Sequence, residues 1–537
     1  MKNNIIKTVL PAAVVGLVFS ACTKMEDIGT MNTGSYTDTT GTLKSATTMP
    51  IGFAAYQGDP GFNSYWPIIV AEGTNITPGN EMKHGSIVTS SGAMDYTKAD
   101  ALVNKAQAAG LDVYGHTLAW HSQQNATYIK SYAGITVPAA AELITNPGFE
   151  ATPAGSGWAT YNAQNGATVT YPTTGGTNAH AGAGFMQVVN PVSNPGGEWK
   201  VQVASTAFPT VIGKQYVVTY WVKAATGGGS IRLSTSGTPM YQGGQTIGTT
   251  WQQITWNITA NVTSTSILFD MGLVANTYNI DDVSVKEVIT PPSGAQVAVK
   301  VDELMNSFIT GMVTRYKGKV KAWDVVNEPL IDNGSLRSVS NYGSTPGNDV
   351  FFWQDYSYNG VPKDYAVKAF QYAAAADPAA KLFINDYNLE SSKAKIDSLV
   401  AYVTYLKGKG AKIDGIGTQM HCDVFKTNYG GIDYMFQKLA ATGLLVKVTE
   451  LDITIKGSVS DATVADAQVA GYQAAMYNYI VAAYMKYVPA AQRAGITFWG
   501  VDDPDSWRAS QLPVMWDKNF KKKPAYSGAA NALKANK

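Results

Sequence analysis

Short apolar runs alternate with longer stretches of helical period along most of the chain from about residue 49. Runs of four to seven mostly apolar residues predict buried strands, whereas apolar positions three and four residues apart at 96–109 and 464–487 predict helices. Strands that alternate with helices indicate a parallel sheet or barrel, and the spacing of the later strands suits a (β/α)₈ barrel. The predicted strands are 51–55, 111–115, 320–326, 382–385, 413–419, 446–450 and 496–500.

The strand–helix rhythm is broken between residues 115 and 320, an interval of 205 residues that is far longer than one strand–helix unit needs. Residues 141–290 carry only 12 charged side chains in 150 positions, against 67 in the other 387. Strand-like segments at 217–222 and 252–258, separated by glycine-rich turns, are typical of a β-sandwich. We therefore expect a TIM barrel interrupted after its third strand by an all-β sandwich.

The N-terminus has the features of an export signal. Lys2 and Lys7 flank a short polar start, the apolar run 9–19 is too short to span a bilayer, and small residues then lead to Cys22. This order resembles the lipobox of bacterial lipoproteins, which implies an exported protein held at the cell envelope, at the outer membrane or cell surface, by a lipid on Cys22. A plain secretory signal with a chance cysteine is the alternative. The predicted organisation is a signal peptide at 1–22, a flexible Thr/Ser/Gly-rich tether at 23–47, barrel segments at 48–131 and 292–537, and an inserted sandwich at 141–290.

Composition excludes several classes of protein. The chain has 537 residues, 45% of them hydrophobic, and a net charge of +1, which gives no electrostatic reason to expect nucleic acid as a partner. Its two cysteines, Cys22 and Cys422, lie 400 residues apart, so a disulfide framework is excluded and paired zinc-type spacings are absent. We expect Cys422 to be a small packed thiol. The 30 Tyr and 12 Trp fit either core packing or a cleft that stacks sugars.

Two glutamates follow strand-like runs at their carboxyl ends. Glu328 ends the run that starts at Trp323, and Glu450 ends the run that starts at Leu444. They are 122 residues apart, about three strand–helix units, so both would face the barrel mouth, where barrel enzymes place their catalytic residues. Cleavage of a glycosidic bond uses two such carboxyl groups, one to protonate the leaving oxygen and one to attack the anomeric carbon or activate water. Either glutamate alone could instead be a solvated strand-end residue.

Six segments, in order along the chain, resemble glycoside hydrolase family ten, the xylanase family. Residues 323–329 (WDVVNEP) are similar to the family's acid/base motif, and 448–452 (VTELD) are similar to its nucleophile motif. The resemblance covers about 49–131 and 292–530. It implies a retaining endo-β-1,4-xylanase that acts on xylan and xylo-oligosaccharides and requires no cofactor. The other matching segments are 115–123 after the third strand, 385–388 after the fifth, 418–421 after the sixth, and 497–501 with Trp507 after the eighth.

The resemblance implies a role for each matching residue. Glu328 would be the general acid and then the general base, and Glu450 would form the glycosyl-enzyme intermediate. The charge of ionised Glu450 is expected to help raise the pKa of Glu328. Asn327 would hydrogen-bond the sugar 2-hydroxyl, His421 would bond the nucleophile, and Asp452 would orient that histidine. Taken alone, a strand-end histidine is usually a satisfied polar residue, and a tryptophan usually belongs to the core. The implied substrate-binding residues are Asn80, Lys83, His116, Trp120, Gln123, Tyr387 and Gln419, under an apolar roof of Trp499 and Trp507.

Two departures from the family pattern concern the cleft. Gly79 stands where the family usually has a glutamate that contacts the distal sugar, which implies either a weaker subsite or room for a decorated sugar. After Gln123 the family usually has a proline and an aromatic residue, whereas this chain continues with 124–127 (QNAT) and then enters the insertion. We expect the nearby cleft edge to be rebuilt by the inserted module.

The inserted segment more loosely resembles carbohydrate-binding modules of families four and twenty-two, through 142–150 (ELITNPGFE), 157–158 and 278–283 (YNIDDV). The resemblance implies a jelly-roll sandwich with a structural calcium near Glu150 and Asp282. A sandwich that binds no ligand is the alternative. Two or three exposed aromatic residues are expected to stack on sugars, drawn from Trp158, Trp199, Tyr220, Trp221, Tyr241, Trp251 and Trp256.

Two other functions fit the same residues. A β-1,4-glucanase or mixed-substrate glycosidase could use this constellation wherever the hydroxymethyl group of glucose fits, and Gly79 keeps this alternative open. A non-catalytic, glycan-binding surface lipoprotein is the third, although both glutamates and their supporting residues are present. Glu450→Ala separates the classes, because an enzyme would lose turnover and keep binding.

Overall fold

The computed structural model describes residues 41–136, 139–289, 291–455 and 466–537. The chain divides into two compact units, one formed by residues 134–292 and the other by the rest of the chain. The predicted signal peptide, its Cys22 and the tether up to residue 40 lie outside the described residues. Among the helices that are described, none combines the length and the apolarity needed to cross a bilayer.

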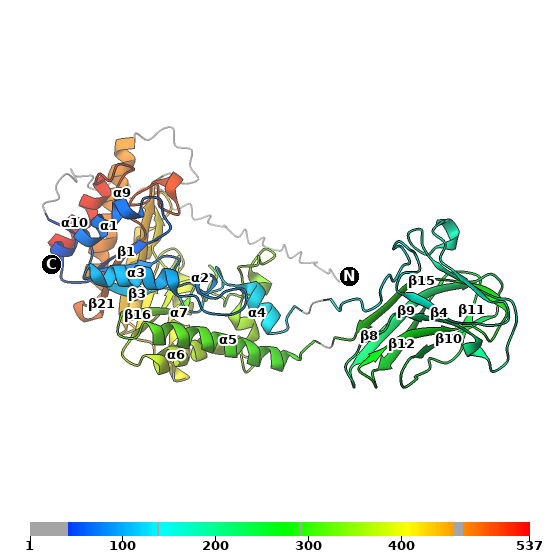
Figure 1. Cartoon of the computed structure of the whole chain (residues 1–537). Helices are drawn as coiled ribbons and strands as arrows, with labels where there is room; N and C mark the ends of the chain where they lie inside the picture. Colours follow the sequence, from blue (N-terminus) through cyan, green and yellow to red (C-terminus); the bar gives the residue numbers. More distant parts are fainter. Residues whose placement is uncertain (1–40, 137–138, 290, 456–465) are drawn as a thin grey trace, which may run out of the picture. The chain divides into compact units, whose positions relative to one another are not determined.

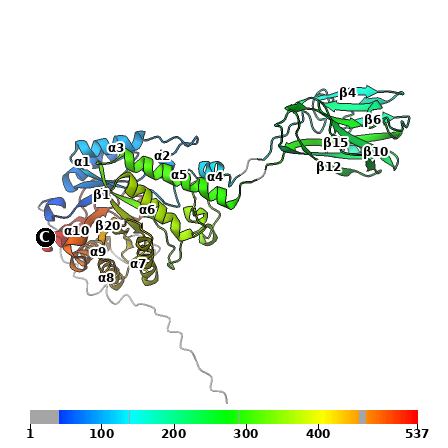
Figure 2. The ribbon, with the colours of Figure 1, turned by 90° about the horizontal axis from the view of Figure 1, so that it is seen from below.

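The larger unit is a closed parallel barrel surrounded by helices, as predicted (Figures 1 and 2). In order around the barrel, its strands are β1 (Ile51–Ala55), β2 (Asn75–Pro78), β3 (Asp112–Gly115), β16 (Val320–Asn327), β17 (Lys381–Asp386), β18 (Gly415–Thr418), β20 (Leu445–Thr454) and β21 (Arg493–Phe498). Neighbouring strands pair in parallel, and the pairing of β18 with β20 closes the ring. A short strand, β19 (His421–Asp423), adds to the later part of β20.

Helices form the outer layer of the barrel (Figure 2). One of them, α5, begins after the insertion with a capping box, in which Ser293 and Gln296 each accept the other's backbone N–H with their side chains. Its inward face buries apolar residues four and three positions apart, Val301, Met305 and Phe308. The helices are α1 (Phe62–Glu72), α2 (His84–Ile87), α3 (Thr97–Ala108), α4 (Ala126–Tyr132), α5 (Gly294–Arg315), α6 (Tyr365–Ala376), α7 (Lys393–Gly408), α8 (Tyr429–Ala440), α9 (Asp466–Tyr487) and α10 (Pro524–Ala535).

The barrel interior contains both close packing and a polar network. The ring of Trp323 packs so closely on Gly115 that a Cβ atom there would lie 2.1 Å from it. The next residue along β16, Asp324, accepts a hydrogen bond of 2.6 Å from the Tyr114 hydroxyl and pairs with His116 Nδ1 at 2.9 Å. Since all three are buried, this network fixes the His116 ring at the carboxyl end of β3.

The smaller unit is a β-sandwich of two five-stranded antiparallel sheets around one apolar core (Figure 1). One sheet contains β11 (Gln245–Ile247), β10 (Gly229–Thr235), β14 (Ile267–Asp270), β7 (Val201–Ser205) and β4 (Trp158–Ala163); the other contains β12 (Gln252–Thr259), β9 (Gln215–Ala224), β15 (Asn276–Glu287), β6 (Met186–Asn190) and β5 (Thr168–Thr170). A short ribbon pairs β8 (Phe208–Pro209) with β13 (Ser264–Thr265). Most connections between consecutive strands run from one sheet to the other, as in a jelly roll.

Two of the sandwich's candidate stacking residues are well exposed, Trp199 at 48% and Tyr241 at 58%. Trp158 and Tyr220 belong to the core, and the His180 ring stacks on Trp221 with 3.8 Å between ring centroids. Trp251 and Trp256 are partly buried.

The carboxylates expected to hold calcium are engaged by other partners. Glu150 accepts the N–H groups of Ala183 and Gly184, and Asp282 pairs with His180 Nδ1 at 2.7 Å. Within the described residues, no group of three or more His, Cys, Asp or Glu side chains is arranged to hold a metal. The calcium site stays a prediction.

Candidate active site

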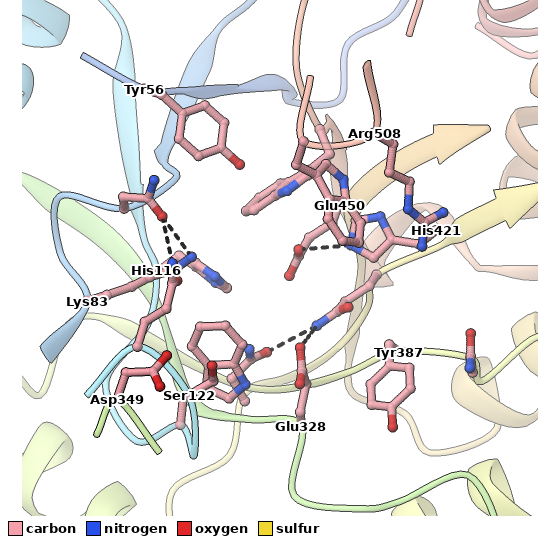
Figure 3. A pocket seen from close by; sticks show the side chains of 18 of the residues that line it. Tyr56, Lys83, His116, Ser122, Glu328, Asp349, Tyr387, His421, Glu450 and Arg508 are labelled. Atoms are coloured by element: carbon pink, nitrogen blue, oxygen red, sulfur yellow. Dashed lines mark hydrogen bonds and ion pairs between the residues drawn. The ribbon is translucent and has the colours of Figure 1, made fainter. Parts of the chain in front are cut away.

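A cavity of about 740 Å³ lies at the carboxyl ends of the barrel strands (Figure 3). Seven of the eight barrel strands contribute a lining residue at or just past that end, where TIM-barrel enzymes place their active sites, and β20 contributes Glu450, which lies between its pairings with β18 and β19. All the residues that the sequence assigns to catalysis or substrate binding line this cavity, except Asp452, which lies behind His421. The lining residues are Tyr56, Asn80, Lys83, His116, Trp120, Ser122, Gln123, Asn327, Glu328, Arg337, Asp349, Tyr387, Asn388, Gln419, His421, Glu450, Trp499, Trp507 and Arg508.

Glu328 and Glu450 project into the same space from opposite sides (Figure 3). A chain of amides joins them: Asn385 Nδ2 donates to Glu450 Oε1 and to Asn327 Oδ1, both at 2.9 Å. From the other side, Gln419 Nε2 donates to Glu328 Oε1 at 3.0 Å and lies 3.4 Å from Asn327 Oδ1. Both carboxyl groups are thus held in fixed positions by side chains from other strands of the barrel.

The backbone at Glu328 is also held in place. Glu328 adopts a left-handed conformation with φ +52°, which costs about 1–3 kcal/mol in a residue other than glycine and recurs at active sites. Its N–H donates to the Asn385 carbonyl at 2.8 Å, and its own carbonyl accepts from Arg337 Nε at 3.1 Å. Arg337 also donates to the Tyr387 hydroxyl at 2.8 Å. This turn aims the Glu328 side chain into the cleft.

His421 connects Glu450 to a buried carboxylate. Its Nε2 lies 3.2 Å from Glu450 Oε2, and its Nδ1 forms an ion pair with Asp452 Oδ2 at 3.0 Å. Trp507 Nε1 donates to the same Asp452 oxygen at 2.7 Å. Burial lowers the pKa of His421, but Asp452 and Glu450 outweigh it and raise the pKa to about 10. The imidazole is therefore protonated at neutral pH and donates to Glu450.

The pKa of Glu328 is lowered from its ordinary value in the free protein. Burial raises this pKa, but His121, the hydrogen bond from Gln419 and the Arg337 guanidinium together lower it by more. His121 Nδ1 is 4.0 Å from Glu328 Oε2, and burial lowers the pKa of His121 to about 4. His121 is therefore neutral at pH 6, and its charge acts on Glu328 only in more acidic solution.

Polar side chains gather on one side of the cleft. Lys83 Nζ donates to Asn80 Oδ1 at 3.1 Å and lies 4.9 Å from the centre of the Trp120 ring. His116 meets Trp499 edge to face, with ring centroids 5.3 Å apart. These residues combine hydrogen-bonding groups with flat apolar surfaces, which match the hydroxyl groups and the apolar faces of sugar rings.

Lys83 should make substrate affinity dependent on pH. Burial lowers its pKa to about 8, against the raising effect of Glu450, Glu328 and Glu81, so the ammonium is charged below pH 8 and neutral above it. Because a charged donor forms a stronger hydrogen bond, KM for a substrate bound beside Lys83 should rise about three- to tenfold between pH 7 and pH 9.5. Steady-state kinetics on wild type and Lys83→Met would check this. The variant should have a high KM at both pH 7 and pH 9.5. A rise of KM with pH that persists in the variant would contradict the role of Lys83.

Several residues of the site were not assigned from the sequence, chiefly Asn385, Arg337 and Tyr56. Asn385 and Tyr56 stand at carboxyl ends of barrel strands, a position that could have marked them. Arg337 lies in the loop after β16, where no periodicity indicates its place.

The cleft edge beside Gln123 is completed in part by the barrel's own loops. Asp349 lines the cavity, and its carbonyl accepts the Gln124 N–H at 2.8 Å. Asn125 caps α4 through its side chain. A contribution of the inserted module to this edge stays a prediction.

The closed barrel, with two glutamates joined by amides at its mouth, defines a barrel glycoside hydrolase. The family model described as Glycosyl hydrolase family 10 matches residues 41–146 and 290–532. The chain belongs to this family, and the match is interrupted where the sandwich is inserted.

Known relatives match part of this chain. The chain is 37% identical over 244 residues to "Endo-1,4-beta-xylanase A" of Cellvibrio japonicus, a match covering 42% of this chain and 39% of that protein. It is 35% identical over 241 residues to "Exoglucanase XynX" of Acetivibrio thermocellus, covering 43% of this chain and 20% of that protein. The chain thus spans well under half the length of these relatives. Among solved structures, a xylanase (Xyn10A) from Cellvibrio japonicus shares the fold, with a TM-score of 0.54, 23% identity, and coverage of 92% of this chain and 99% of that one.

Proposed function

We propose that this protein is a retaining endo-β-1,4-xylanase that cleaves the xylan backbone by double displacement. One observation carries the proposal: Glu328 and Glu450 meet across the cleft of a family 10 barrel, joined through Asn385, Asn327 and Gln419. The names of the xylanase relatives support xylan as the substrate.

Glu450 attacks the anomeric carbon in the first step. The protonated His421 and Asn385 each donate to one of its two oxygens, which positions the carboxylate for attack. Glu328 donates its proton to the departing glycosidic oxygen, and Asn327 bonds the sugar 2-hydroxyl in the transition state. The two carboxyl groups supply both the nucleophile and the proton transfer, so the proposed reaction requires no cofactor.

The proton of Glu328 has to be available when the substrate is bound. In the free protein the surroundings lower its pKa. A sugar chain in the cleft excludes water from the carboxyl group and raises that pKa, while the charge of Glu450 acts in the same direction. Once Glu450 is bonded to the sugar its charge is lost, the pKa of Glu328 falls, and the carboxylate accepts a proton from the incoming water.

Product analysis tests this function. Protein lacking residues 1–22 would be incubated with glucuronoxylan, arabinoxylan and carboxymethylcellulose, and the products followed by chromatography and NMR. Xylo-oligosaccharides released first as the β-anomer are the expected result. Binding of these polymers without release of products would favour a glycan-binding protein with an inactive barrel.

A β-1,4-glucanase or mixed-substrate glycosidase is the second candidate. The relative named "Exoglucanase XynX" favours it, because that protein shares 35% identity with this chain over the matched residues. Hydrolysis of carboxymethylcellulose but not of xylan would select this alternative.

The inserted sandwich is proposed to bind xylan through its exposed aromatic side chains. Trp199 and Tyr241 support this role, since flat exposed rings stack on sugars. Affinity electrophoresis of the sandwich unit with xylan tests it, and an unretarded protein would favour a sandwich without a ligand.

Export and a lipid anchor on Cys22 remain part of the proposal. The order of a charged start, a short apolar run and Cys22 supports them. Cells fed a labelled fatty acid should incorporate it into wild type but not into Cys22→Ala, and secretion of an unlabelled wild-type protein would favour the plain signal.

A further inference from the structure

Tyr56 lies in the wall of the cleft, directly after β1. Its N–H donates to the Tyr65 hydroxyl at 3.2 Å, and that hydroxyl donates to the Tyr56 carbonyl at 3.0 Å. With its backbone fixed in this way, the Tyr56 ring stands edge to face with Trp499, with 6.3 Å between centroids. Its hydroxyl end points into the cavity, toward the middle of the cleft (Figure 3).

Gly79 makes room for this ring. Its N–H donates to the Ala55 carbonyl at 3.0 Å, so residues 56 and 79 stand side by side where β1 and β2 end. A Cβ atom at residue 79 would lie 2.0–2.5 Å from three carbon atoms of the Tyr56 ring, closer than atoms can approach. The space that a side chain at residue 79 would enter is thus occupied by Tyr56, which leaves no opening for a decorated sugar at that point.

A second cavity adjoins the cleft at Tyr56 and Asn80, which line both. Its volume is about 460 Å³, within the usual range of ligand pockets. Glu81 is buried in its wall and accepts the N–H groups of Gln57 at 2.7 Å and Asn80 at 3.1 Å. Asp59 is half-buried, and its Oδ2 lies 3.1 Å from the Tyr65 hydroxyl oxygen. The cavity therefore has a structured polar wall.

The charges of this wall favour a neutral ligand. Burial raises the pKa of Asp59 to about 6, so this carboxyl is mostly ionised at pH 7. Asp59 and Glu81 face a single cation in the lining, the exposed Lys98, and Ser86 adds a hydroxyl. Carboxylates accept hydrogen bonds from sugar hydroxyl groups, whereas a uronic acid would be repelled by the excess negative charge.

We propose that Tyr56 and the adjoining cavity form a distal subsite for a neutral sugar unit. Tyr56 provides a flat edge and a hydroxyl to the sugar that lies beside Asn80, in place of a side chain at residue 79. The next unit, the third from the cleaved bond, enters the cavity and bonds Asp59. This subsite rests on the proposed xylanase function.

Aryl β-xylobioside and aryl β-xylotrioside differ by the one unit that would enter the cavity. At pH 7, wild-type kcat/KM should be about tenfold higher for the trioside, as expected for one charge-assisted hydrogen bond. Asp59→Asn should reduce this preference to about threefold or less, whereas Tyr56→Phe should lower kcat/KM for both substrates by a similar factor, because both place a sugar unit beside Asn80. A trioside with a uronic acid on its third unit should lose the advantage over the bioside.

Tyr358→Phe makes the same change as Tyr56→Phe at an exposed tyrosine that lines neither cavity, and it should keep the wild-type kcat/KM on both substrates. Equal rates on the two substrates in wild type, a preference that Asp59→Asn does not reduce, or an unchanged kcat/KM of Tyr56→Phe on both substrates would overturn the distal subsite and leave the xylanase function standing. A wild-type protein that cleaves neither substrate would instead overturn the xylanase function on which the subsite rests.

Discussion

Replacement of Glu450 by alanine should lower kcat on xylo-oligosaccharides by roughly 10⁴-fold or more, because no other group can form the glycosyl-enzyme bond. Binding should survive, since Asn80, Lys83 and the aromatic walls are untouched. Steady-state kinetics and calorimetric titration with xylotetraose would measure the two quantities. Added azide can replace the missing nucleophile, and the product it forms should be the α-xylosyl azide, as expected for attack from the side that Glu450 occupies.

Glu303→Ala is a matched control for this experiment. Glu303 is an exposed glutamate on α5 paired with Lys300 at 2.8 Å, and it lies outside the catalytic cavity. The control should keep its activity. A Glu450→Ala protein that retained more than about a tenth of wild-type kcat would show that the nucleophile is another group.

Replacement of Glu328 by glutamine should have an effect that depends on the leaving group. On xylan, kcat/KM should fall about 10²–10⁴-fold, because the departing sugar oxygen needs a proton. On an aryl xylobioside with an acidic phenol, formation of the glycosyl-enzyme should be little changed, since that phenolate leaves without a proton. Pre-steady-state kinetics should therefore show a burst of phenol followed by slow turnover, and azide should restore turnover with a β-azide product.

An equal loss on both substrates, with no burst, would contradict the acid/base role. Gln354→Ala would not serve as a control here, because its side chain bonds the Arg337 carbonyl and so supports the turn at Glu328. Tyr358→Phe is preferable, since its ring lies outside the cleft.

Much of the barrel is predictable because its strands are buried on both faces and form apolar runs. All seven predicted strands overlap observed ones, and the first matches residue for residue at 51–55. The strand that was missed, β2, has four residues, of which only Ile76 is large and apolar, and it ends at Pro78. Its strand character comes from pairing with β1 and β3, which a local pattern does not contain.

The site is predictable to the extent that its residues follow strands. Glu328, Glu450 and His421 are placed by position and motif, and the structure brings them together. The lowered pKa of Glu328 in the free protein could not be predicted, because His121 and Arg337 approach this carboxyl group from loops whose course the sequence does not reveal. The same limit applies to Tyr56, whose importance depends on the absence of a side chain at residue 79.

At the point of insertion, the two chain segments that border the gap contact each other within the barrel, and the two ends of the insertion contact each other within the sandwich. In the barrel, Tyr132 at the end of α4 donates to Glu303 of α5 at 3.2 Å, so the two helices that flank the gap are held together by their own contacts. In the sandwich, the Leu143 N–H donates to the Val285 carbonyl at 3.0 Å, so its first and last segments also meet. A gene segment with such ends can be gained, exchanged or lost as a single cassette, so the ancestry of the sandwich can differ from that of the enzyme that carries it.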